Sequence, residues 1–164
     1  MFSHFRILLI STTISAFAFA LSPGDLALIG YTGDNPDDFE ILLLSDLPSG
    51  HTIYVTDCGV KADGSIRTGE GNMSYTSTED ILAGSVLFHS DFGGNNVAFS
   101  GNGDQAIVYE LDANGNPLYL FAIQADGSEW DADATSAATS ALPPGLTEGS
   151  TALAFGEQDN YEYN

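Results

Sequence analysis

The stretch that decides the fold reads Val108-Tyr-Glu-Leu-Asp-Ala-Asn-Gly-Asn-Pro-Leu-Tyr-Leu-Phe121. Two apolar, β-prone runs flank the dipeptide Asn114-Gly115. Both residues of this dipeptide tolerate the positive φ that a tight hairpin turn requires. The segment therefore predicts two antiparallel strands joined by a hairpin turn.

The turn of this segment also resembles the first half of a calcium-binding EF-hand loop, with oxygen-bearing side chains at Asp112, Asn114 and Asn116. The second half departs from that pattern. Pro117 stands where the loop needs a glycine for its sharp turn, and Ile123 stands where it needs a bidentate glutamate. The hairpin is therefore the preferred interpretation.

Working outward from the hairpin, similar short apolar runs recur along the chain between clusters of Gly, Asp, Asn, Pro and Ser. Their spacing of roughly 8–15 residues is typical of an all-β sandwich or barrel. No window shows a sustained helical period, and one helical turn is expected near residues 78–82. We expect an antiparallel β-sandwich of about 8–9 short strands with at most one or two helical turns. The expected strands lie near residues 26–31, 39–44, 52–56, 86–89, 97–100, 106–111, 118–123 and 151–155.

Two features of the hydrophobic pattern refine this expectation. The run 118–123 is continuously apolar, as is 41–44, which indicates strands covered on both faces or strands at the edge of a core. The stretch 131–144 is rich in Ala, Ser and Thr and ends in Pro-Pro, so it predicts a long loop before the last strand. No internal repeat or domain boundary is visible, which indicates one domain.

The first 20 residues have the pattern of a secretory signal peptide. Arg6 precedes an apolar stretch of about 13 residues, shorter than the roughly 20 that a membrane-spanning helix needs. The stretch ends in Ala18-Phe19-Ala20, the small-x-small pattern of a cleavage site. We expect cleavage after Ala20, with Ala18 as the alternative, to give a secreted, extracellular domain over residues 21–164. A buried N-terminal helix is the other interpretation.

The mature chain would be very acidic. Lys61 and Arg67 are its only cations against 23 acidic residues, a formal charge of 2 − 23 = −21. Nucleic acid and anionic membranes are excluded as partners because both need a basic surface. Cations, cationic surfaces or basic proteins fit better, although acidity can also serve only to keep a secreted protein soluble. The oligomeric state is left open.

Two clusters of acids are candidate calcium sites, because calcium takes six to eight oxygen ligands from loops rich in Asp, Asn and Gly. The first contains Asp34, Asp37 and Asp38, followed by Glu40. The second contains Asp131 and Asp133, preceded by Asp126 and Glu129. A divalent ion would relieve the repulsion within each cluster. The alternative is a set of solvated loops that bind nothing.

The sequence contains little that indicates a catalytic site. His51 and His89 are the only histidines after the signal peptide, and no Gly-x-Ser-x-Gly motif is present. Cys58 is the only cysteine, so no intrachain disulfide can form and a zinc site is not indicated. We expect Cys58 to be a small buried residue at a strand end, with pairing between chains or a reactive thiol as the alternative. We therefore expect no catalytic residues and no enzyme activity.

Asn72-Met73-Ser74 is an N-glycosylation sequon. It predicts a glycoprotein where the secretory pathway glycosylates, with Asn72 as the acceptor on the surface.

Segments spread in order over nearly the whole mature chain carry a resemblance to a known kind of domain. They are Gly24-Asp-Leu-Ala27 with Gly30-Tyr31, Asp38-Phe39, Pro48-Ser-Gly-His-Thr-Ile-Tyr-Val-Thr-Asp57, Thr68-Gly-Glu-Gly71, Gly103-Asp-Gln105, Trp130, Ala141-Leu-Pro-Pro-Gly-Leu-Thr147 and Asp159-Asn-Tyr161. With these segments the chain resembles an accessory domain of the lamin-tail type that recurs in secreted and surface proteins of bacteria and some algae. This resemblance implies a β-sandwich without catalytic residues of its own, sometimes found beside nuclease or phosphatase modules. Cys58 departs from the pattern, since similar sequences tend to have asparagine there.

Four acids within these segments, Asp25, Asp57, Glu70 and Asp104, stand at expected strand ends beside Gly or Thr. Their side chains could cap turns by accepting main-chain hydrogen bonds, or they could converge on one ion.

These observations together lead us to expect a non-catalytic, cell-surface or extracellular matrix or adhesion domain, with calcium as its candidate ligand. The alternatives are a secreted hydrolase or its accessory domain, and a secreted effector that binds a basic protein. A hydrolase would need a concave pocket holding a histidine or a pair of carboxylates.

Overall fold

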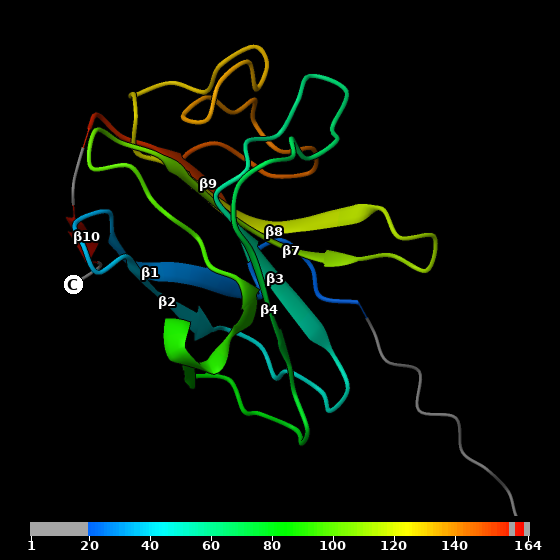
Figure 1. Ribbon diagram of the computed structural model, residues 1–164. Helices are drawn as coiled ribbons and strands as arrows, with labels where there is room; N and C mark the ends of the chain where they lie inside the picture. The colour runs from blue at the N-terminus through cyan, green and yellow to red at the C-terminus, as the bar shows by residue number, and fades with distance from the viewer. Residues whose placement is uncertain (1–19, 158–159, 163–164) are drawn as a thin grey trace, which may run out of the picture.

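The computed structural model describes residues 20–157 and 160–162 of the 164-residue chain. This part is a β-sandwich of two sheets (Figure 1). The four-stranded sheet has the order β10–β1–β2–β5, and the six-stranded sheet has the order β6–β4–β3–β7–β8–β9. The elements are β1 (Leu26–Thr32), β2 (Asp38–Leu43), β3 (Thr52–Thr56), β4 (Asn72–Thr76), β5 (Val86–Phe88), η1 (His89–Asp91), β6 (Gly93–Asn95), β7 (Gln105–Leu111), β8 (Pro117–Gln124), β9 (Ala152–Ala154) and β10 (Asn160–Glu162).

The expected all-β sandwich is confirmed. Its strands pair antiparallel throughout, except that β8 and β9 run parallel. The expected hairpin joins β7 to β8, with Gly115 at a φ of 83°. The carboxylate of Asp112 accepts the main-chain N–H groups of Asn114 and Asn116, each at 2.8 Å. The acid that resembled an EF-hand ligand therefore closes the hairpin turn.

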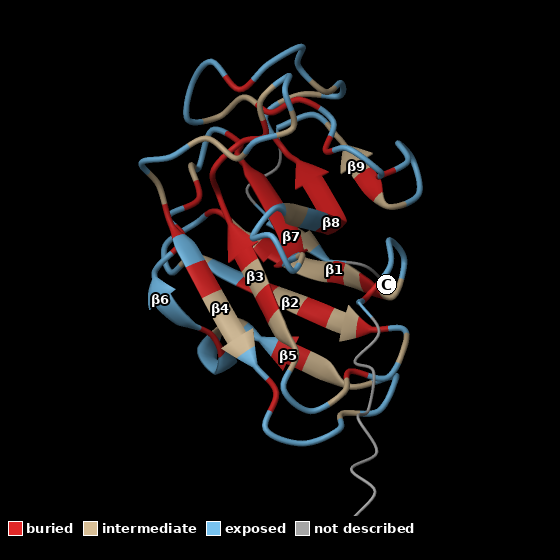
Figure 2. Ribbon diagram, turned by 90° about the vertical axis from the view of Figure 1, so that its right-hand side faces the viewer, coloured by how far each residue is buried: buried red, intermediate tan, exposed pale blue. Residues whose placement is uncertain are grey.

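The sandwich has a core on each face of the six-stranded sheet. The larger core fills the space between the two sheets and contains Phe39, Val55 and Leu120. A smaller core on the outer face contains Ile107 and Tyr119. β7 and β8 are thus buried on both faces (Figure 2), as the continuous apolar run 118–123 indicated.

Two long loops cover that outer face, the β3–β4 loop (residues 57–71) and the β8–β9 loop (residues 125–151) (Figure 1). They are joined where Val60 N–H donates to Ser140 Oγ at 2.9 Å and Val60 C=O accepts the N–H of Ala141 at 2.8 Å. The main chains approach so closely at Gly59 that a Cβ there would overlap the carbonyl oxygen of Thr139. The expected loop over 131–144 is therefore present and is held against the sheet.

Several local expectations are wrong. Residues 97–100 form no strand, because the N–H of Ala98 donates to the side chain of Asp57 instead of to a neighbouring strand. Residues 78–82 form no helical turn, and the only helical segment within the described residues is η1. β4, β6 and β10 were not expected, since their sequences are polar or glycine-rich. No helix in the described part of the chain is long and apolar enough to cross a membrane.

Candidate functional site

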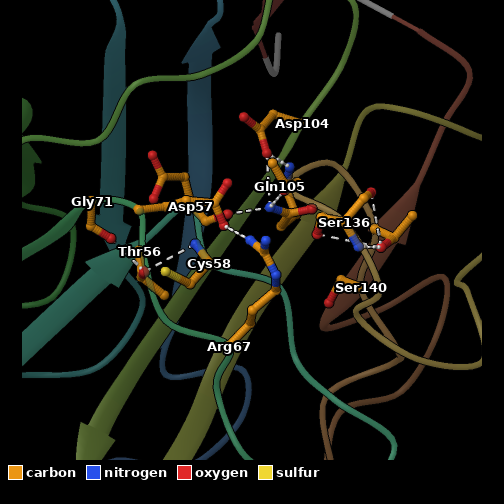
Figure 3. A network of polar contacts seen from close by, with 12 residues as sticks. Thr56, Asp57, Cys58, Arg67, Gly71, Asp104, Gln105, Ser136 and Ser140 are labelled. Atoms are coloured by element: carbon orange, nitrogen blue, oxygen red, sulfur yellow. Dashed lines mark hydrogen bonds and ion pairs between the residues drawn. The ribbon is translucent and has the colours of Figure 1, made fainter.

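A buried polar network lies at the end of the six-stranded sheet where β3 ends and β7 begins (Figure 3). The side-chain amide of Gln105 donates to Asp104 Oδ1 at 2.8 Å, to the main-chain oxygen of Ala137 at 2.7 Å and to the main-chain oxygen of Asp57. The two acids and Gln105 are all buried. This arrangement ties the β8–β9 loop, through Ala137, to the ends of both central strands.

Main-chain N–H groups donate hydrogen bonds to the carboxylates of this network. Asp104 accepts the N–H of Ser100 at 2.9 Å and that of Gln105 at 2.8 Å, and Asp57 accepts the N–H of Ala98 at 2.7 Å. Through Ala98 and Ser100, the two carboxylates hold the segment that connects β6 to β7. Their geometry is that of turn caps, since both oxygens of Asp104 and Oδ2 of Asp57 accept main-chain N–H groups, whereas Oδ1 of Asp57 is buried without a hydrogen-bond partner.

Burial sets the charge state of this cluster. Removal from water disfavours a carboxylate anion, so burial raises the pKa of Asp104 to about 7 against the opposing effect of its main-chain hydrogen bonds. Burial also raises the pKa of Asp57 and of nearby Glu70, and repulsion by Asp57 adds to the rise in the pKa of Glu70 and of Asp104. The network thus holds three acids whose protonated forms are favoured by their surroundings.

Glu70 and Cys58 complete this end of the molecule. Arg67 Nη1 lies 2.8 Å from Glu70 Oε2, the only ion pair of the described residues that involves a lysine or arginine. Cys58 is a free thiol with 4% of its surface exposed, and burial raises its pKa. Its environment fits the expected buried residue, because a thiol with a raised pKa forms little reactive thiolate.

The sequence left two roles open for Asp25, Asp57, Glu70 and Asp104, and the structure gives these four acids different partners. Asp57 and Asp104 are caps within the network, and Glu70 pairs with Arg67. Asp25 is also a cap, because it accepts the main-chain N–H of Ser22 and the hydroxyl of Ser45, both at 2.7 Å.

The first predicted calcium cluster lies at the start of β2 and in the loop before it. Asp34 Oδ2 lies 3.4 Å from the side-chain amide of Asn160, and Asp38 Oδ1 lies 3.7 Å from His89 Nδ1. Asp37 is half-buried, and its pKa is raised chiefly by that burial. Asp37 and Asp38 thus both lie near His89, whereas Asp34 lies near Asn160.

The second predicted calcium cluster lies in the β8–β9 loop, where both side chains are exposed. Asp133 accepts the main-chain N–H of Ala62 at 2.9 Å and so joins the two covering loops. Asp131 pairs through its main chain with Ala141. Within residues 20–157 and 160–162, no three or more His, Cys, Asp or Glu side chains are grouped so that they could hold a metal ion. Calcium binding stays a prediction.

One of the three buried acids of the described residues, Glu110, was missed by the sequence reasoning. Glu110, near the end of β7, lies 3.7 Å from Nδ1 of His51, and the two side chains are only 7% and 9% exposed. They border a surface hollow of about 530 Å³, which Tyr54 and Leu118 also line. Nε2 of His51 is buried and has no hydrogen-bond partner, so it is inaccessible to a molecule in the hollow. The available signal was a glutamate inside an otherwise apolar strand.

Asn72, the predicted glycosylation site, is exposed at the start of β4. Its side-chain amide donates to the hydroxyl of Tyr109 at 2.8 Å. Glycosylation stays a prediction.

No protein-family model, curated protein or solved structure matches this chain. The resemblance to lamin-tail-type domains therefore stays a proposal that the β-sandwich architecture is compatible with.

Proposed function

We propose that this chain is a secreted, non-catalytic β-sandwich that acts in an extracellular matrix or at a cell surface, where its carboxylates bind cationic surfaces or basic proteins. One observation carries this proposal. Most of the described acids are exposed, and Arg67–Glu70 is the only ion pair with a lysine or arginine among the described residues. Unneutralised charge of one sign attracts oppositely charged partners over about a Debye length.

The buried acids support the non-catalytic part of the proposal. Asp104 and Oδ2 of Asp57 accept main-chain amides, Oδ1 of Asp57 is buried, and the imidazole next to Glu110 is closed to solvent at Nε2. A general acid or base must come within hydrogen-bond distance of the proton that it transfers. These buried groups instead contact other parts of the protein.

The first experiment measures binding of the mature domain to immobilised polylysine across a series of salt concentrations. We expect affinity to fall steeply with salt, because each neutralised carboxylate releases counterions. A triple variant, Asp126→Asn with Glu129→Gln and Asp131→Asn, removes three exposed charges from the β8–β9 loop and should lower both affinity and the salt dependence. Glu79→Gln, in the β4–β5 loop, is the matched control for a charge elsewhere. Binding that is absent, or that does not change with salt, would refute the proposal.

Calcium is tested separately by thermal unfolding with calcium, magnesium or a chelator at fixed ionic strength. A ligand that binds only the folded state at a hundredfold excess over Kd stabilises it by about 2.7 kcal/mol. A rise in Tm of several degrees that is specific to calcium and lost in Asp37→Asn/Asp38→Asn would place the ion in the β1–β2 loop, and its loss in Asp131→Asn/Asp133→Asn would place it in the β8–β9 loop. Equal small shifts with calcium and magnesium would show only charge screening.

A further inference from the structure

Glu110 and His51 form a buried polar pair that has no role in the proposed surface function. Both side chains are more than nine-tenths buried, and the carboxylate is 3.7 Å from Nδ1 of the imidazole. No lysine or arginine of the described residues pairs with Glu110, since Arg67 is held by Glu70 and Lys61 forms no ion pair. A buried carboxylate without a permanent cation is costly.

The main-chain N–H of Leu21 lies next to this carboxylate and favours its charged form, which opposes the rise in pKa that burial causes. The side chain of Leu21 is buried in the core between the sheets, and a turn closed by Ser22 N–H and Asp25 Oδ2 at 2.7 Å follows directly. The nitrogen of Leu21 is thereby fixed in position. Ala20, the residue before it, is exposed at the rim of the hollow that Glu110 and His51 border.

Leu21 is the residue that becomes the N-terminus if the signal peptide is cleaved after Ala20. In the uncut chain its nitrogen is an amide with one hydrogen and no charge. After cleavage the same nitrogen is an ammonium group with three hydrogens and a positive charge. The positive charge attracts the carboxylate of Glu110 directly, which the uncharged amide of the precursor does not do.

We propose that Glu110 and His51 form the binding site for the α-ammonium group of the mature N-terminus, Leu21, so that removal of the signal peptide creates the cation that this buried carboxylate lacks. The inference rests on the secretion proposed above. It also selects one cleavage site, because cleavage after Ala18 would place the ammonium group two residues before the site.

The consequence is that maturation stabilises the fold. The ammonium group would join Leu21, β7 and the residue before β3 through one ion pair in a low-dielectric setting, where charge interactions are strong. The precursor would have the same sandwich with only the uncharged amide of Leu21 beside the carboxylate.

The test compares three forms of the domain made with a protease that leaves no extra residue: a form starting at Leu21, a form starting at Ala20, and the Leu21 form acetylated at its amine. Residues 21–164 contain every described strand, so all three forms carry the whole sandwich. At neutral pH we expect the free Leu21 form to unfold about 3–8 °C above the other two. Equal Tm values for the three forms would overturn the proposal.

Glu110→Gln, made in the Leu21 and acetylated forms, separates this role from general packing. The variant should remove the difference between the two forms, whereas Glu129→Gln, on the exposed β8–β9 loop, should preserve it. A loss of stability in Glu110→Gln that leaves the difference intact would show that Glu110 only packs. If Glu110→Gln does not fold, the three forms of the native sequence still decide the proposal.

The pH dependence gives an independent readout. The α-amine should titrate above its usual pKa of about 7.7–8.0 in the folded domain, because the carboxylate favours its charged form. The advantage of the free amine is then fully present below about pH 7.7 and is lost as the pH rises through the higher folded pKa. The other titratable groups around Glu110 are His51, Asp25, and Tyr54 and Asp112 at the hollow; they are the same in both forms, so they cancel in the comparison.

Processing is measured separately by mass spectrometry of the protein secreted from cells. A mature mass that begins at Leu21 supports the whole proposal. A mature mass that begins at Phe19 would refute the role in maturation even where the purified Leu21 form shows the stabilisation, and absence of secretion would contradict the proposed function itself.

Discussion

Asp104 should make the stability of this domain fall as the pH rises. Its carboxyl group has a pKa of about 7 in the folded protein against an ordinary value of 3.8, so between these values the folded state binds a proton that the unfolded state has released. The free energy of unfolding decreases with pH wherever the folded state binds more protons. A shift of about three units, at 1.36 kcal/mol per unit, is worth about 4 kcal/mol in full. About 3 kcal/mol of it falls between about pH 4.5 and pH 8.5.

The assay is chemical unfolding of wild type and Asp104→Asn across that range, with exposed Asp126→Asn as the control for total charge. Asparagine cannot accept all three amide hydrogen bonds that Asp104 receives, so the variant carries an offset that does not vary with pH. On top of this offset, the variant should gain about 3 kcal/mol relative to wild type as the pH rises. The control should gain far less. If the difference between Asp104→Asn and wild type is the same at every pH, Asp104 is ionised throughout, and its hydrogen bonds outweigh its burial.

Three further predictions concern packing. Gly59→Ala should cost about 2–3 kcal/mol of unfolding free energy, because the new Cβ meets the carbonyl oxygen of Thr139, whereas Gly93→Ala, with open space around it, should cost under about 1 kcal/mol. Leu120→Ala should cost about 2–5 kcal/mol in the same denaturant titration, because the side chain is fully buried. The thiol of Cys58 should react with a thiol reagent only after unfolding; rapid reaction in the native protein would contradict its burial.

The sandwich and its central hairpin could be predicted because their signals are local. Asn114-Gly115 and the apolar runs on either side specify a turn and two strands without reference to the rest of the chain. β4 lacked such a signal, since Asn72-Met73-Ser74 alternates one buried residue with polar ones, and its place next to β3 depends on tertiary pairing. A strand of this kind can be predicted only when the strands that it pairs with are known.

The polar networks were predictable only in part. The sequence marked Asp57 and Asp104 as turn caps or ion ligands, and the structure shows caps. The choice depended on contacts such as that between Asp57 and Ala98, which are 41 residues apart. Glu110 was not singled out, because a single glutamate in a strand is ordinarily exposed. Its burial results from the way the chain around Leu21 packs beside β7.

The edge strands of the two sheets affect whether copies of this protein aggregate at high concentration. All four edge strands, β10, β5, β6 and β9, are three residues long. Each therefore presents only a short row of free amides and carbonyls to another chain, too short to serve as a template for strand addition. Neighbouring copies with the same strong negative charge also repel one another. The architecture thus favours discrete molecules over fibrils at high protein concentration.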